Sequence, residues 1–263
     1  MSRVDVLKLK AGNRPVLFAV HGSGGLLSYG KIARYLDHDQ PMYVVKGKEL
    51  DKMGYPFRDL YDLAEQYVPA MLAVQPEGPY LICGRYSPIV IEVGQQLLSR
   101  GLPVALSMVF DMAPPEYTQK ARRTLLLASY HWYKRLLLRG IAKTTSAGAS
   151  LIRGRAGSRM SSEPDTMKNG TGLVSGRTVN DSLQANYLLK KYPAKVVYIQ
   201  CMDFRQAPKK ARHIAKWRAV ADEVDVRVTP GGHSTMYEKP HVQILARIVQ
   251  SERDKATASQ ASS

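Results

Sequence analysis

The sequence predicts an α/β fold in which a mainly parallel sheet carries helices on both faces. Apolar runs suited to strands alternate with segments of helical spacing, beginning with VLFAVH at 16–21 and LLSYGKIARYL at 26–36. Strands separated by helices of this length form right-handed βαβ units. The 263-residue chain with 44% hydrophobic residues can bury one core of this kind and carry an insertion.

The alternation of strand and helix continues along the chain and then resumes after an interruption. Further strands are predicted at 41–47, 80–84, 104–111, 194–201 and 224–230. Further helices are predicted at 59–75, 89–101, 208–221 and 241–250.

This order of elements predicts a core that the chain forms in two parts. Residues 1–115 supply the first part and residues 184–250 the second. Residues 116–183 mix many Arg and Lys with Leu-rich stretches and end in a Ser, Gly and Thr-rich segment, which predicts a basic helical lid insertion. The polar residues 251–263 are predicted to form a disordered tail.

The cysteines, the apolar runs and the net charge indicate the compartment and the kind of partner to expect. Cys83 and Cys201 each lie inside an apolar run, which indicates buried thiols rather than a secreted disulfide framework. The N-terminal segment lacks the apolar stretch of a signal peptide, and no long uncharged apolar run suggests a membrane span, so a soluble cytoplasmic protein is expected. The formal charge of +16 favours acidic partners.

Four segments resemble the α/β-hydrolase thioesterase domains of polyketide synthases and nonribosomal peptide synthetases. They occur in the family's order within residues 14–250, and the lid is the part without a counterpart. The segments are LFAVHGSGGLLSYGKIARYL, QPEGPYLICG, VFDMAPP and PGGHSTMYEKPHVQILARIV.

The resemblance implies a hydrolase or acyltransferase that acts on carrier-bound acyl thioesters in secondary-metabolite or lipid-like biosynthesis, without a metal or cofactor. In that family a serine attacks the thioester, a histidine acts as base and an aspartate orients the imidazole. His233 matches the base and Ser87 is the candidate nucleophile. Asp111 matches the acid of the modular enzymes, whereas Asp203 matches the position used by related discrete thioesterases.

The glycine turn after the first core strand offers candidate oxyanion donors. Gly22 and Ser23 belong to the sequence HGSGG, whose small residues let backbone N–H groups approach a reacting carbonyl.

The nucleophile turn departs from the family pattern Gly-x-Ser-x-Gly. Here it reads Gly84-Arg85-Tyr86-Ser87-Pro88, so alignment on the glycine places Tyr86 at the nucleophile position. Pro88 has no N–H to donate to an oxyanion if Ser87 is the nucleophile. An alternative therefore stays open, namely a catalytically degenerate thioesterase-fold protein that binds an acyl group or a carrier protein without turnover.

The basic lid predicts an acidic partner. An acidic acyl or peptidyl carrier protein with a phosphopantetheine arm would suit a surface that contains Arg122, Arg123 and Arg135. A basic amphipathic helix could also rest on an anionic membrane surface. Nucleic acid is a less suitable partner because no recognition motif accompanies the charge.

Overall fold

The computed structural model describes residues 3–23, 25–50, 55–115, 176–203 and 207–261. These residues belong to one compact unit formed by Met1–Pro115 and Thr171–Ser263. Of the predicted lid, residues 116–175 lie outside the described residues, and its end forms the short helix α5 (Gly176–Leu183).

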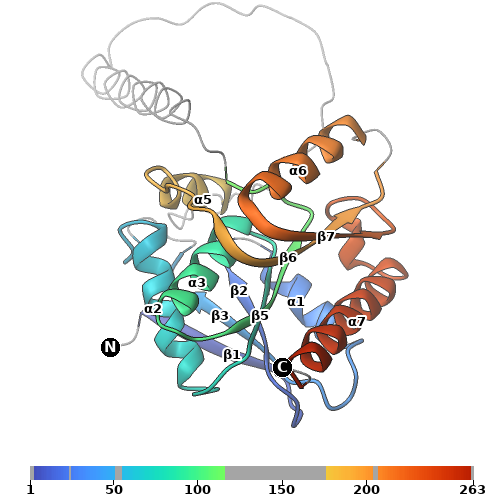
Figure 1. Cartoon of the computed structure of the whole chain (residues 1–263), viewed down its shortest axis with the longest axis horizontal. Coiled ribbons are helices and arrows are strands. Elements are labelled where there is room, and N and C mark those ends of the chain that lie inside the picture. The colour runs from blue at the N-terminus through green and yellow to red at the C-terminus, as the bar shows by residue number, and fades with distance from the viewer. Residues whose placement is uncertain (1–2, 24, 51–54, 116–175, 204–206, 262–263) are drawn as a thin grey trace, which may run out of the picture. The chain divides into compact units, whose positions relative to one another are not determined.

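A seven-stranded sheet forms the centre of this unit (Figure 1). Its spatial order is β1-β3-β2-β4-β5-β6-β7, in which β1 runs antiparallel to β3 and every other neighbouring pair is parallel. The mainly parallel sheet predicted from the sequence is thereby confirmed. The strands are β1 (Val4–Lys10), β2 (Leu17–His21), β3 (Met42–Gly47), β4 (Tyr80–Gly84), β5 (Val104–Phe110), β6 (Tyr192–Cys201) and β7 (Ala221–Thr229).

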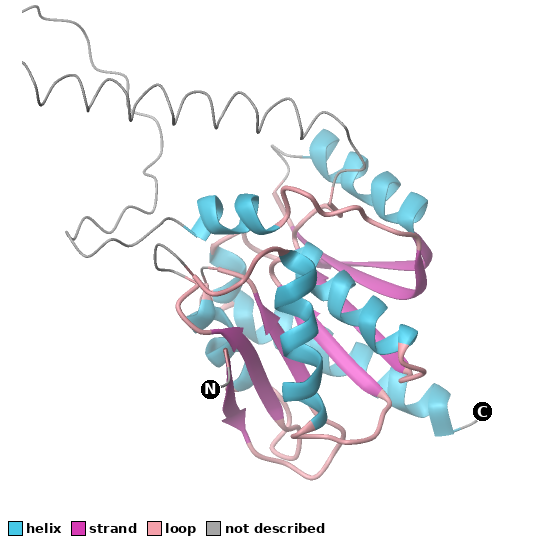
Figure 2. Cartoon of the chain, turned by 90° about the vertical axis from the view of Figure 1, so that its left-hand side faces the viewer, coloured by secondary structure: helices cyan, strands magenta, loops and turns pink. Residues whose placement is uncertain are grey.

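Helices cover both faces of the sheet, as Figure 2 shows. One apolar cluster joins the sheet to α2, α3, α5 and the inner side of α6, and a second cluster joins its opposite face to α1 and α7. Their bounds are α1 (Leu26–Ala33), α2 (Leu60–Leu72), α3 (Ser87–Ser99), α6 (Ala207–Val220), the 3₁₀ turn η2 (Thr235–Tyr237) and α7 (His241–Ala261).

The central strands β2 and β4 are buried on both faces because their residues, apart from His21 at the end of β2, carry no polar group that needs water. Every residue of β2 and β4 is buried, which is the pattern expected where helices cover a parallel sheet on both sides. Helix α2 begins after Asp59, whose carboxylate accepts a hydrogen bond from the backbone N–H of Asp62 at 2.9 Å. The hydrophobic pattern of β2 and β4 and the N-cap of α2 thus account for the positions of these elements.

The prediction of a disordered tail at 251–263 is wrong for most of that segment, because α7 continues to Ala261. Glu252 and Arg253 are buried although both are charged. The carboxylate of Glu252 accepts two hydrogen bonds from the Arg227 guanidinium of β7, at 2.7 and 3.2 Å. This paired contact keeps the polar end of the helix on the sheet.

No helix within the described residues combines the length and apolar character that a membrane crossing requires.

Candidate active site

The candidate residues gather where the parallel strands end. His21, Gly84 and Cys201 are the last residues of β2, β4 and β6, and Asp111 directly follows β5. Carboxyl ends of parallel strands meet at one edge of a sheet, which is where open α/β sheets bind their ligands.

Asp111 is fixed by its backbone and by several donors. Its φ of 52° is positive, an uncommon conformation for a residue with a side chain, and its N–H donates to the carbonyl of Ile199 at 2.8 Å. One carboxylate oxygen accepts from the backbone N–H of Cys201 at 2.9 Å, and the other lies 2.9 Å from Nδ1 of His233. The carboxylate therefore has a single orientation, toward His233.

A lysine that the sequence analysis did not single out shares this carboxylate. The ammonium of Lys210, on α6, donates to Asp111 and lies 2.9 Å from the sulfur of Cys201. Both Asp111 and Lys210 are buried. Lys210 precedes Ile214 and Trp217 by four and seven residues, so helical spacing places it on the inward face of α6. A lysine at this spacing from apolar residues is the sequence signal that would have identified it.

Burial alone would raise the pKa of Asp111, but the hydrogen bonds from His233 and Lys210 and from the backbone of Cys201 outweigh it. They hold the pKa of this carboxyl well below its usual range. Burial alone would lower the pKa of Lys210, but its contacts with Asp111 and Cys201 raise it above its usual value. Asp111 is thus a carboxylate whose charge is shared between an imidazole and an ammonium.

His233 lies in the turn between β7 and η2, where the sequence places the base. Gly231 has a φ of 89°, and the N–H of Gly232 donates to the hydroxyl of Thr235 at 2.8 Å, so the turn is held locally. The His233 side chain is 52% exposed. Because the carboxylate of Asp111 only accepts, Nδ1 donates to it, and Nε2 is left with a lone pair that can take a proton.

The structure brings Asp111 rather than Asp203 to Nδ1 of His233. A single proton sits on that nitrogen, and the bond to Asp111 uses it. Asp203 follows β6, and its own N–H donates to the carbonyl of Cys201 at 3.1 Å. Asp111 is therefore the carboxylate that contacts the His233 ring in this arrangement.

Ser87 is not brought to His233 in this arrangement. It is the first residue of α3, it is fully buried, and its hydroxyl donates to the backbone carbonyl of Ala113 at 2.5 Å. The single hydroxyl proton is therefore given to a carbonyl and not to an imidazole. Its N–H contacts the sulfur of Met112 at 3.4 Å.

The turn that carries Ser87 also lacks the strained backbone of a nucleophile elbow. Tyr86 precedes the helix with φ −101° and ψ 98°, an ordinary extended conformation. Among the described residues other than glycine, positive φ occurs at Glu49 and Asp111, and neither belongs to this turn. Pro88 stands in the first turn of α3, where its missing N–H costs the helix nothing.

Tyr86 occupies the nucleophile position of the alignment but is engaged elsewhere. Its hydroxyl donates to the backbone carbonyl of Asn180 on α5 at 2.8 Å. Burial raises the pKa of the Tyr86 phenol above its usual range, so the phenolate is less available than in water.

The candidate oxyanion donor is also occupied. The N–H of Ser23 donates to the side-chain carbonyl oxygen of Asn180 at 2.9 Å. Gly22 lies beside this contact, and a Cβ added there would come within 2.7 Å of the Tyr86 ring. Asn180 was not predicted because it is 157 residues away from Ser23 in a polar segment without a motif.

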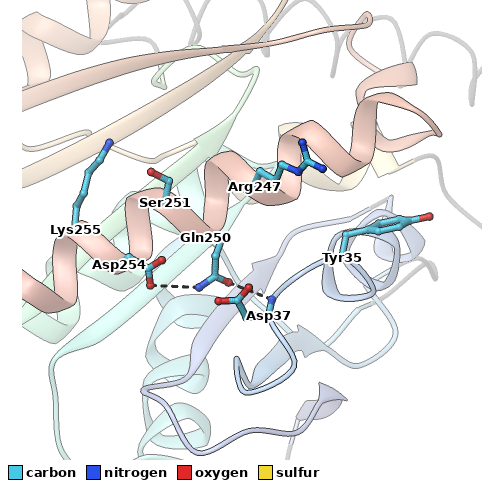
Figure 3. A pocket seen from close by; sticks show the side chains of 7 residues that line it. All are labelled: Tyr35, Asp37, Arg247, Gln250, Ser251, Asp254 and Lys255. Carbon is cyan, nitrogen blue, oxygen red and sulfur yellow. Dashed lines mark hydrogen bonds between the residues drawn. The ribbon is translucent and has the colours of Figure 1, made fainter.

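A polar hollow lies away from these residues, between α7 and the loop that leads from α1 to β3 (Figure 3). That loop enters β3 at the amino-terminal edge of the parallel strands, opposite to the edge of Asp111 and His233. Figure 3 shows Gln250 of α7 bonded to Asp254 and to the backbone of Asp37.

Comparison with known proteins agrees with the motifs. The model of the thioesterase domain family matches residues 14–151, just over half of the chain. A dimodular nonribosomal peptide synthase of Bacillus subtilis (strain 168) is 30% identical over 121 residues, which are 44% of this chain and 5% of that protein. An inactive atromentin synthetase of Paxillus involutus is 31% identical over 107 residues, 39% of this chain and 11% of that protein. The chain thus spans only a small part of these relatives.

Solved thioesterase domains share the fold over nearly the whole chain. The NocB thioesterase domain from the nocardicin cluster has a TM-score of 0.63 at 18% identity and covers 97% of this chain and 100% of that one. The wild-type Vlm2 thioesterase domain has a TM-score of 0.59 at 18% identity, with 94% and 97% covered. These likenesses confirm the predicted α/β-hydrolase fold. With the family match, they show that this chain belongs to the thioesterase domain family.

Proposed function

We propose that this chain is a thioesterase-fold protein that binds a carrier-bound acyl group without transferring it to a serine. The observation that supports this proposal is the position of Ser87, which is fully buried and donates its only hydroxyl proton to Ala113. A serine becomes a nucleophile when a neighbouring base takes that proton. Among the described residues, the His233 ring is hydrogen-bonded to Asp111 and not to Ser87.

The surroundings of the site support the same proposal. Tyr86, which aligns with the family's nucleophile, donates to the backbone carbonyl of Asn180, and the candidate oxyanion donor Ser23 is bonded to the side chain of the same residue. Pro88 adds no donor. Loss of one oxyanion donor alone costs about 2.7–4 kcal/mol of transition-state stabilisation.

A second candidate is acyl-thioester hydrolysis or acyl transfer that uses Ser87, and the intact pair of Asp111 and His233 favours it. The exposed imidazole retains the orientation that a general base needs. This function requires Ser87 to leave Ala113 and turn toward His233.

The partner that we propose is an acidic acyl or peptidyl carrier protein. The relatives include nonribosomal peptide synthases, and the chain carries a formal charge of +16. Residues 120–159, which lie outside the described residues, concentrate much of the positive charge. Binding that depends on such charges should weaken steeply with salt, and reversal of Arg122, Arg123 and Arg135 should slow association.

Turnover of an acyl thioester separates the two functions. Wild type, Ser87→Ala and His233→Ala are each incubated with an octanoyl thioester of N-acetylcysteamine, and release of the free thiol is followed by chromatography. The binding function predicts equal, near-background rates for all three proteins. Turnover by wild type that both substitutions abolish would establish the second candidate and contradict the first.

Binding is measured on the same wild-type protein. A carrier protein whose phosphopantetheine arm bears an acyl group through a stable amide should bind more tightly than the same carrier without the acyl group. Equal affinity for the two carriers would contradict an acyl-binding role. Anionic vesicles provide the competing surface, and binding to vesicles but not to any carrier would exclude carrier docking.

A further inference from the structure

Asn180 makes three hydrogen bonds with the two turns of the candidate site, besides the one that its backbone carbonyl accepts from the N–H of Gln184 at 3.1 Å. Its side-chain oxygen accepts from the N–H of Ser23 at 2.9 Å, and its side-chain nitrogen donates to the carbonyl of Ser23 at 3.1 Å. Its backbone carbonyl accepts from the hydroxyl of Tyr86 at 2.8 Å. One residue of α5 thereby joins the glycine turn to the nucleophile turn.

The two contacts with Ser23 form a matched pair. The backbone of Ser23 offers one donor and one acceptor, and a carboxamide supplies the complementary acceptor and donor within a single planar group. An ester or thioester has the carbonyl oxygen but no N–H, so it can satisfy only the donor of Ser23. Leaving the part-buried carbonyl of Ser23 without its donor loses this hydrogen bond, so the contact favours amides over esters.

The surroundings shape this contact and hold it in place. Val179 and Leu183, on the same helix as Asn180, are buried in the apolar cluster of the core. A Cβ added to Gly22 would lie 2.7 Å from the Tyr86 ring and 3.0 Å from the side-chain oxygen of Asn180. The site therefore depends on a glycine at position 22 to admit an amide beside Ser23.

We propose that the backbone of Ser23 is a binding site for a carboxamide group, which Asn180 of the same chain occupies and for which an amide of the bound ligand competes. The inference rests on the proposed function and adds the ligand class. The site that binds an acyl group without turnover favours acyl groups that carry an amide, as a peptidyl group does, over simple fatty acyl groups.

Removal of the internal amide opens the site to small probes. In Asn180→Ala, acetamide should shift the backbone amide resonance of Ser23 in a saturable manner, as followed by ¹⁵N NMR. Methyl acetate has the same carbonyl but no N–H, and it should bind at least about fivefold more weakly, since one neutral hydrogen bond contributes about 1 kcal/mol. In wild type, acetamide should have little effect on this resonance because Asn180 fills the site.

Gln184→Ala is the matched control. Gln184 directly follows α5, four residues after Asn180, and its side-chain amide donates to the carboxylate of Asp181 at 3.3 Å in an exposed contact. This variant shortens a polar side chain next to the same helix and leaves the contacts of Ser23 intact. It should respond to both probes as wild type does.

A second variant keeps the inference testable if Asn180→Ala does not fold. Asn180→Asp keeps an acceptor for the N–H of Ser23 but has no donor for its carbonyl, so acetamide should still compete in this variant. Equal binding of acetamide and methyl acetate, or no binding of either, would overturn the carboxamide site. These readouts do not depend on turnover, so they can fail while the proposed function stands, and the reverse also holds.

Discussion

Replacement of Asp111 by Asn tests how much the buried ion pair between Asp111 and Lys210 contributes to the free energy of unfolding. The side chains of Asp111 and Lys210 are 4% and 8% exposed, so Asp111→Asn leaves an ammonium buried without its counterion. Removal of one member of a buried ion pair costs about 3–5 kcal/mol. The amide retains an oxygen that can accept from the N–H of Cys201, so this bond need not be lost. We therefore expect the free energy of unfolding to fall by about 3–5 kcal/mol.

Urea denaturation followed by far-UV circular dichroism measures this loss. Lys210→Met is the matched control, because it removes the ammonium and leaves Asp111 bonded to His233 and Cys201. The double variant removes both charges, so its loss should be smaller than the sum of the two single losses by about 0.5–3 kcal/mol.

The effect should also depend on pH in a defined direction. The pKa of Asp111 is depressed in the folded protein. An unfolded Asp binds a proton near pH 3.9, so the contribution of Asp111 is complete above that value and is lost as the pH falls toward the folded pKa. The stability difference between wild type and Asp111→Asn should be largest near pH 7 and shrink from about pH 5 toward pH 2. A difference below about 1 kcal/mol at pH 7, or one that grows on acidification, would refute the ion-pair argument.

Two further predictions follow from contacts away from this carboxylate. Ser87→Ala should lower the free energy of unfolding by about 1–3 kcal/mol in urea denaturation, because the carbonyl of Ala113 loses its donor, whereas a stability equal to wild type would show that the bond is unimportant. Truncation after residue 251 should lower the thermal midpoint markedly, because Arg227 then loses the buried carboxylate of Glu252, and truncation after residue 258 is the control that should change it little.

Motifs that combine several local signals were predictable from the sequence. Asp111 follows an apolar strand and His233 lies in a glycine turn, so both could be placed at the carboxyl edge of the sheet before their 2.9 Å contact was known. The alternation of strands and helices gave the mainly parallel sheet for the same reason.

Features that depend on contacts distant in sequence were not predictable. Strand β1 was not predicted because the adjacent apolar residues Val6 and Leu7 interrupt the alternation of apolar and polar residues along it. The last turns of α7 read as a polar tail because the ion pair between Glu252 and Arg227 leaves no trace in local composition. The lid prediction for residues 116–175 lies outside the described residues.

The nucleophile turn is an intermediate case. The sequence showed that Tyr86 and Pro88 depart from the family pattern, so a turn that differs from the usual nucleophile elbow was expected. It gave no information on the direction of the Ser87 hydroxyl, because the carbonyl of Ala113 that accepts its proton follows a different strand.

Covalent labelling by a serine-directed fluorophosphonate tests most directly whether the chain uses an acyl-serine. Wild type and Ser87→Ala are incubated with the reagent, and adducts are located by mass spectrometry of peptides. Since the hydroxyl of Ser87 is buried and bonded to Ala113, we predict no adduct on Ser87 under conditions that label an active serine hydrolase completely. A stoichiometric adduct on Ser87 that disappears in His233→Ala would contradict the account.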